Sequence, residues 1–384
     1  MSTKYIPRFI MRQRYILWFA LFSSVFFYDV SFSQSGPMLM QPYLQAVTTS
    51  SIYVLVESFT TDTVFVEYGL TPSYGKRAWT ESCDTTTNTT FIHNVKITGL
   101  TPNTLYYYRA LQWRSVADGS TFRTAPDPGT PFRFAWVADF RTGVTVHDSI
   151  SRRVAEANPA VSLYGGDLCL NSSYSMFKAQ FFRPTELALI ARVPFFNTVG
   201  NHEKWTPNTR AFTQAPSSAS GTQEYYSFDY GDMHVLVLNN EIPDDATSPQ
   251  YQFARTDLSS TQRAWKVVIC HRPAYCAGGH GEDKDMKYMS EKIFEPNHVN
   301  VVLSGHTHFF QHNLVNGIHH MVIGSAGAPL YDLGTAPYVV KGARDYNFAI
   351  TDVSPTSFHM MVYNDRGMPL DTLILNKANG SKSK

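Results

Sequence analysis

The feature that most constrains this chain is a set of apolar segments that each end on an acidic, amide or imidazole side chain. These segments have the length and composition of buried strands. The five segments, each with its polar end, are Phe132–Ala138 before Asp139, Ala160–Tyr164 before Asp167, Val193–Val199 before Asn201 and His202, Trp265–Cys270 before His271, and Val299–Leu303 before His306 and His308. Because ligands of open α/β sheets bind beyond the carboxyl ends of the strands, we predict that these ends converge on one cleft.

The residue types at these ends indicate a metal site. Taken singly, an Asp at a strand end is usually a helix cap, and a lone His is usually a buried core residue. Five such ends that together supply carboxylate and imidazole groups are typical of a site for divalent metals.

The sequence also indicates two domains. Short runs separated by Gly and Pro predict a small β-sandwich before residue 124. Its predicted strands are Ile52–Glu57, Thr63–Tyr68, Thr90–Thr98, Leu105–Trp113 and Ser120–Arg123. Residues 99–109 resemble the late strand region of fibronectin type III domains, with Tyr106 or Tyr108 as the core tyrosine.

A Pro- and Gly-rich linker over residues 125–131 precedes a region where apolar strands alternate with predicted helices. This alternation predicts α/β layers. The predicted helices are His147–Asn158, Ser173–Arg192 and Asp283–Phe294, and a hairpin turn is predicted at residues 364–367. We therefore expect domains over residues 34–126 and 127–376, followed by a polar tail over 377–384.

The N-terminus has the pattern of an export signal. Lys4, Arg8, Arg12 and Arg14 precede an apolar stretch over residues 16–28, and small residues stand before a predicted cleavage point at Gln34. The stretch is shorter than the roughly 20 residues of a membrane span. We predict a signal peptide over residues 1–33 and a secreted or periplasmic protein with no membrane span in its mature chain; an uncleaved anchor is the alternative.

Charge argues against nucleic acid as a partner. Residues 1–33 hold four basic side chains and one acidic one, so the 32 basic and 31 acidic residues of the chain fall to 28 and 30 after cleavage. A slightly acidic chain without a basic stripe is not expected to bind nucleic acid specifically. The four cysteines, Cys83, Cys169, Cys270 and Cys276, are expected either as disulfides of an exported protein or as buried thiols.

The five polar ends resemble the blocks of the calcineurin-like metallophosphoesterase superfamily, which run Asp, Gly-Asp, Gly-Asn-His-Glu, His and Gly-His-x-His. This resemblance spans residues 132–330. The sandwich ahead of it, joined through residues 122–126, resembles the purple acid phosphatase branch. The resemblance implies a fibronectin type III-like sandwich followed by an α/β domain built as a β-sheet sandwich flanked by helices.

The resemblance also implies a ligand set and a reaction. Two divalent metals, expected to be Zn, Mn or Fe, are bridged by Asp167; the second metal also takes Asn201, His271 and His306, and the first takes Asp139 and His308. Hydroxide bridging the metals attacks phosphorus. His202 contacts the phosphate or acts as general acid, with Glu203 orienting it.

Two positions depart from the family pattern at the first metal. The family usually has His or Gly where this chain has Arg141, and purple acid phosphatases have Tyr where it has Leu170. The first site is therefore expected to bind weakly or to complete its shell with water, with Cys169 or Asn171 as alternatives. Arg141 is expected either to bind a phosphate oxygen or to form a surface salt bridge.

The loop after His271 adds a further candidate. His280 stands where purple acid phosphatases place substrate-facing histidines, often two in succession, but Gly281 follows it here. It is expected to contact substrate, with an exposed loop residue as the alternative. The prediction is an exported phosphoester hydrolase that favours phosphodiesters. The alternatives are a phosphomonoesterase and a non-catalytic binding protein with a decayed metal site.

Overall fold

The computed structural model describes residues 1–2 and 38–377. The predicted signal sequence beyond Ser2 and the cleavage point at Gln34 lie outside the described residues. In the part that is described, no helix has the length and hydropathy that crossing a bilayer requires.

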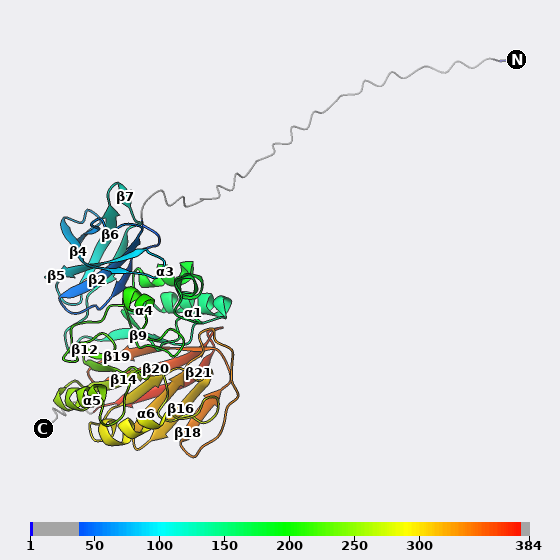
Figure 1. Cartoon of the computed structure of the whole chain (residues 1–384). Coiled ribbons are helices and arrows are strands. Elements are labelled where there is room, and N and C mark those ends of the chain that lie inside the picture. Colours follow the sequence, from blue (N-terminus) through cyan, green and yellow to red (C-terminus); the bar gives the residue numbers. More distant parts are fainter. Residues whose placement is uncertain (3–37, 378–384) are drawn as a thin grey trace. The chain divides into compact units, whose positions relative to one another are not determined.

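The N-terminal part is a β-sandwich, as predicted (Figure 1). Its strands are β1 (Tyr43–Gln45), β2 (Ser51–Ser58), β3 (Phe65–Gly69), β4 (Lys76–Thr85), β5 (Phe91–Thr98), β6 (Leu105–Gln112), β7 (Ser115–Val116) and β8 (Ser120–Arg123). Tyr106 and Tyr108 are both buried in its core. The sequence did not reveal β4, because most of its side chains are exposed and it lacks the alternation of a half-buried strand.

The second part contains the five strands whose ends carry the polar residues. Its elements are β9 (Phe132–Val137), α1 (Val144–Ala157), β10 (Val161–Tyr164), α2 (Tyr174–Met176), α3 (Pro184–Ile190), β11 (Phe195–Asn197), α4 (Pro207–Phe212), β12 (Tyr226–Tyr230), β13 (Met233–Val237), α5 (Pro249–Ser260), β14 (Trp265–Cys270), α6 (Lys284–Met289), β15 (Val301–Ser304), β16 (Phe310–Val315), β17 (Ile318–Ile323), β18 (Val339–Ala343), β19 (Asn347–Val353), β20 (Ser357–Asn364) and β21 (Pro369–Asn376), with π-helical turns at Phe177–Phe181 and Ser290–Phe294.

These elements form the layered α/β fold that the sequence predicted. One sheet contains β9, β10 and β11, and the other contains β14 and β15. Large side chains such as Trp136, Leu163, Val267 and Leu303 share one core cluster between the sheets. Helices α1 and α3 pack on the outer side of the first sheet, and α5 and α6 pack on the outer side of the second. The predicted turn at residues 364–367 is also present, between β20 and β21.

The prediction of one continuous helix over Ser173–Arg192 is wrong. The chain forms α2 and a π-helical turn, breaks at Phe182 and Arg183, and starts again as α3 at Pro184. Proline has no backbone N–H and disfavours helical geometry in the residue before it, so it suits the first turn of a new helix instead.

The two parts of the chain share hydrogen bonds despite the linker between them. Strand β1 of the sandwich pairs with β11 in parallel, which joins strands of both parts in one fourteen-stranded sheet. Lys178 in the π-helical turn also forms an ion pair of 2.7 Å with Glu57 on β2. The side chain of Glu57 is fully buried. The domain bounds at residues 34–126 and 127–376 stay a prediction.

His234 on β13 makes stability depend on pH. Its burial lowers its pKa, but hydrogen bonds to Asp229 and Asp257, at 2.8 and 2.7 Å, outweigh this and raise the pKa to about 9. The protonated ring therefore stabilises the fold fully below its unfolded pKa of about 6.5, by up to about 3 kcal/mol, and loses this effect as pH rises through 9. Urea unfolding of the wild type and His234→Gln at pH 6 and pH 10 should show the wild type's advantage shrinking; an advantage that is equal at both pH values contradicts the prediction.

Candidate metal centre

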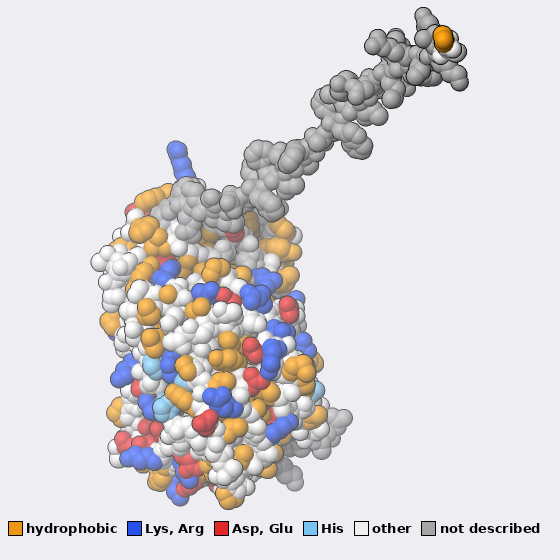
Figure 2. Space-filling view, turned by 90° about the vertical axis from the view of Figure 1, so that its right-hand side faces the viewer, with side chains coloured by type: hydrophobic (Ala, Val, Ile, Leu, Met, Phe, Trp, Pro, Cys, Tyr) orange, Lys and Arg blue, Asp and Glu red, His pale blue; other side chains and the backbone are white. Residues whose placement is uncertain are grey.

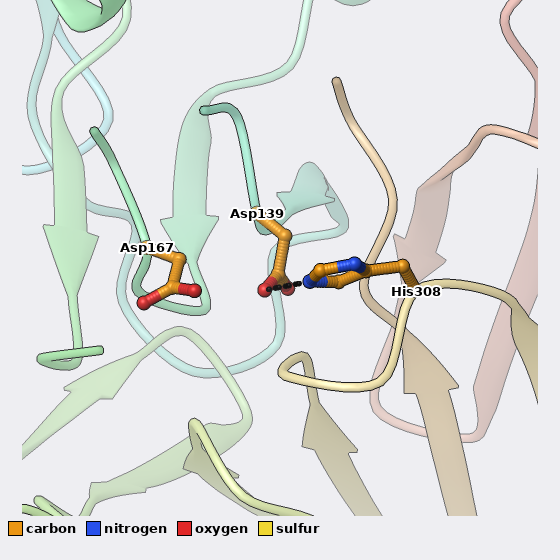
Figure 3. A group of neighbouring side chains, drawn as sticks. All are labelled: Asp139, Asp167 and His308. Carbon is orange, nitrogen blue, oxygen red and sulfur yellow. Dashed lines mark ion pairs between the residues drawn. The ribbon is translucent and has the colours of Figure 1, made fainter. Parts of the chain in front are cut away.

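The five polar strand ends come together, but from two sheets rather than from one. Asp139, Asp167 and Asn201 follow β9, β10 and β11 of the first sheet. His271 follows β14 of the second sheet, and His306 and His308 follow β15. Figure 3 shows Asp139 and His308 pointing toward one another from opposite sides, with Asp167 beside them.

One group of donor atoms surrounds Nε2 of His271. Oδ1 of Asn201 lies 3.0 Å from this nitrogen, Nδ1 of His306 lies 3.2 Å from it, and Oδ1 of Asp167 lies 3.4 Å from it. Ligands of a tetrahedral ion with bonds of about 2.0–2.1 Å are about 3.3–3.4 Å apart. We call these four residues the His271 site; each of the three distances from Nε2 of His271 is close to the separation of neighbouring ligands of one cation.

The hydrogen bond at Nδ1 of His271 supports this fit. Nδ1 donates to the carbonyl oxygen of Gly165 at 2.8 Å, so Nε2 of the neutral ring carries a lone pair. The amide oxygen of Asn201 faces this lone pair at 3.0 Å. Two acceptors at this distance repel one another unless a cation lies between them, so the chemistry of the donors also suits a metal ion.

The backbone around these ligands is strained and closely packed. Asp139, Asp167 and His306 have φ values of 59°, 52° and 65°. Non-glycine residues adopt this left-handed conformation rarely, and they cluster at functional sites. A Cβ on Gly200 would lie 2.3 Å from Oδ1 of Asp167, and one on Gly305 would lie 2.3 Å from Oδ2 of Asp139. Glycine at these two positions therefore lets the carboxylates reach their places.

A second group of donors consists of Asp139, Asp167 and His308, whose ligand atoms lie within 4.8 Å of one another. We call it the His308 site; it holds the residues expected at the first metal. The guanidinium of Arg141 contacts two of the three: Nε donates to Oδ2 of Asp167 at 3.1 Å, and Nη2 donates to Nε2 of His308 at 3.1 Å. Arg141 is buried, so it does not form the surface salt bridge considered as an alternative.

Burial and charge set the protonation of these residues. Burial raises the pKa of Asp139 well above its usual value. Burial acts the same way on Asp167, but neighbouring positive charge, including the guanidinium of Arg141, outweighs it and holds its pKa below the usual value. Burial, with Arg141 adding to it, lowers the pKa of His308 to about 4, so this imidazole is neutral near pH 7.

His202 lies at the edge of the site with its ring partly exposed. Its backbone N–H donates to Oδ1 of Asp167 at 3.1 Å, and Nε2 lies 3.8 Å from Oδ2 of the same carboxylate. The carbonyl oxygen of Leu170 orients the ring by accepting from Nδ1 at 2.7 Å. The expectation that Glu203 orients His202 is wrong: its carboxylate accepts from the backbone N–H of Gly200.

The residues considered as replacement ligands for the His308 site have other partners. The thiol of Cys169 donates to the carbonyl oxygen of Asn171, whose side-chain oxygen accepts from the backbone of Ser173. All four cysteines are free thiols, and three of them are buried.

An aromatic pair lies over the two histidines of the Gly-His-x-His segment. The ring of His280 stacks on His306 with centroids 4.4 Å apart, and the ring of Tyr331 stacks on His308 at 4.2 Å. Nε2 of His280 lies 3.2 Å from the hydroxyl of Tyr331. The sequence suggested His280 but not Tyr331, because a loop tyrosine twenty-three residues after His308 carries no local signal.

Arg272 also escaped the sequence analysis. Its Nη1 lies 3.4 Å from Nε2 of His306, and its guanidinium pairs with Glu241 at 2.8 Å. Its position directly after His271 was the only available signal.

On the face drawn in Figure 2, basic and acidic side chains alternate without a continuous basic stripe.

Comparisons with known proteins define the class of this fold and site. Residues 132–310 match the family model for calcineurin-like phosphoesterases, and residues 40–124 match the model for the purple acid phosphatase N-terminal domain. The chain therefore combines a calcineurin-like phosphoesterase domain with a purple acid phosphatase N-terminal domain, as the sequence motifs predicted.

Particular relatives agree with this assignment. The chain is 32% identical over 281 residues to purple acid phosphatase 21 of Arabidopsis thaliana, a match that covers 66% of this chain and 62% of that protein. The chain thus spans less than two thirds of that relative's length. Its fold is similar to purple acid phosphatase PPD1 from yellow lupin, with a TM-score of 0.76, 17% identity, and coverage of 91% of this chain and 76% of that one. The structure of PhoD gives a TM-score of 0.65 at 14% identity, covering 90% and 94%.

Proposed function

We propose that this protein is an exported, metal-dependent hydrolase of phosphoesters. The observation that carries the proposal is the His271 site, where amide, imidazole and carboxylate donors lie 3.0 to 3.4 Å from Nε2 of His271. Domain matches to phosphoesterases support the same reaction class. The sequence pattern of residues 1–33 supports export.

The proposed activity uses two groups of residues: those that would bind the cation and those that would face the substrate. A divalent cation at the His271 site would supply Lewis-acid activation of water and of a phosphoryl oxygen. Asn201, His271, His306 and Asp167 would hold it, and imidazole with carboxylate suits Zn, Mn or Fe. His202, held by Leu170, is placed to give a proton to the leaving alkoxide.

Arg141 and His280 are the further substrate-facing candidates. In the described part of the chain the hydrogen bonds of Arg141 use Nε and Nη2, which leaves the Nη1 group to donate to a phosphoryl oxygen. His280 lies at the surface above His306, where it would meet the ester group of a substrate.

We propose phosphodiesters as the favoured substrates and phosphomonoesters as the alternative. The charge of Arg141 is already matched by Asp167, so it offers less free positive charge to a dianionic monoester. Gly281, in place of a second loop histidine, leaves more room for a second ester group. The comparison of kcat/KM for bis(4-nitrophenyl) phosphate and 4-nitrophenyl phosphate decides: a higher value for the monoester overturns the diester preference alone.

Removal of metal should abolish the proposed activity. We expect the purified protein to hydrolyse one of these two esters, to lose at least about 100-fold in rate after dialysis against a chelator, and to recover with Zn(II) or Mn(II). Circular dichroism before and after dialysis is the control for unfolding. Metal binding without turnover of either ester would favour the non-catalytic binding protein, and turnover unaffected by chelation would contradict the metal dependence.

A further inference from the structure

The His308 site already contains a positive charge, the guanidinium of Arg141. Arg141 follows Asp139 by two residues and turns its guanidinium toward the space between Asp167 and His308. Its side chain is 11% exposed and that of Asp167 is 1% exposed, so solvent screens this ion pair little. A positive charge is therefore fixed where the family pattern expects the first metal ion.

The contact with His308 excludes a metal ion at the same atom. Nδ1 of His308 donates a hydrogen bond of 2.7 Å to the carbonyl oxygen of Pro329, so Nε2 carries the ring's only free lone pair. Nη2 of Arg141 uses this lone pair at 3.1 Å. One lone pair cannot bind a metal ion and accept a hydrogen bond at once, so the two occupants compete.

A second donor of this site, Asp167, is engaged in the same way. Oδ2 of Asp167 accepts from Nε of Arg141, while Oδ1 of the same carboxylate faces His271. Asp167 therefore spans a guanidinium on one side and the His271 site on the other. A dication beside the guanidinium would meet like-charge repulsion in a buried place, where repulsion is strongest.

We propose that Arg141 takes the place of the first metal ion, so that the centre is mononuclear, with one divalent cation at the His271 site and a guanidinium at the His308 site. This inference rests on the proposed function for the cation at the His271 site. In this arrangement Arg141 holds Asp167 and His308 through Nε and Nη2 and supplies fixed positive charge beside the metal, while Nη1 stays available to a phosphoryl oxygen.

The test is the number of metal ions that the whole protein binds, measured without reference to turnover. The apo protein is titrated with Mn(II) or Zn(II), and bound metal is determined by elemental analysis. We expect one equivalent for the wild type and two for Arg141→His, which removes the charge and offers an imidazole. The second equivalent should bind at least about 100-fold more tightly in that variant than in the wild type. With Mn(II), the variant should also show the electron paramagnetic resonance spectrum of a coupled pair.

Two further variants keep the test decisive. Arg141→Gln removes the charge and keeps a shorter polar side chain, and it should also admit a second equivalent if the histidine variant does not fold. Arg77→His is the matched control, because Arg77 pairs with Glu67 at 2.7 Å on the surface of the sandwich, and its metal content should stay at one equivalent.

Two tightly bound equivalents in the wild type overturn the inference and leave the proposed function standing. A single equivalent in the wild type and in both Arg141 variants overturns it too, because Arg141 would then not be what excludes the second ion. No bound metal in the wild type overturns the proposed function and the inference with it.

Discussion

Replacement of His271 by alanine is expected to lower kcat/KM for the ester substrate by about 1,000-fold. Nε2 of His271 is the atom around which the donors of Asn201, His306 and Asp167 gather, at 3.0 to 3.4 Å. Without it the site loses a ligand and the remaining donors lose their common neighbour. Loss of the cation removes several kcal/mol of transition-state stabilisation, which corresponds to three orders of magnitude in rate.

The measurement pairs steady-state kinetics with metal content, which should fall together. His320→Asn is the matched control: His320 is also buried, on β17 of the same sheet, but its ring contacts Ser290 and Tyr275 rather than the site. Its kcat/KM should stay within about two-fold of the wild type. A His271→Ala protein that keeps both its metal and its activity would remove the His271 site from the mechanism.

Replacement of Lys178 by methionine is expected to destabilise the fold by about 4 kcal/mol. The carboxylate of Glu57 is fully buried and has Lys178 as its cationic partner at 2.7 Å, with a further hydrogen bond of 2.7 Å from Thr90. Removing one partner of a buried pair leaves an uncompensated charge, which costs about 3–5 kcal/mol. Glu57 lies on the sandwich and Lys178 lies in the α/β part. The substitution is therefore expected to weaken the contact between these two parts.

Denaturant unfolding measures this loss. The double variant Glu57→Gln with Lys178→Met should recover most of it, since the buried charge is then absent. Lys287→Met is the control, because Lys287 and Glu282 form a pair of the same length in which both side chains are partly exposed, and its loss should cost less than about 1 kcal/mol. Equal losses for Lys178→Met and Lys287→Met would contradict the expected role of burial.

The local sequence predicted the elements well where burial is regular. Strand β14 occurs with the predicted bounds, Trp265–Cys270, because a short apolar run between polar residues suits a strand buried on both faces. Strand β4 was missed because its side chains are mostly exposed, so its place in the sheet depends on backbone pairing with β3 and β5. Pairing joins residues far apart in the sequence, and no local pattern encodes it.

The same distinction between local sequence and long-range packing applies to the metal centre. The order of residues is enough to predict the chemistry: which strand ends carry Asp, Asn and His, and that Arg141 and Leu170 depart from the family pattern. The packing of the folded chain decided that the ends come from two sheets and that Leu170 acts through its carbonyl oxygen on His202. It also decided that the guanidinium of Arg141 turns inward onto Asp167 and His308. The residue type fixes what a side chain can donate or accept, but the direction in which it does so depends on the packing of segments distant in the chain.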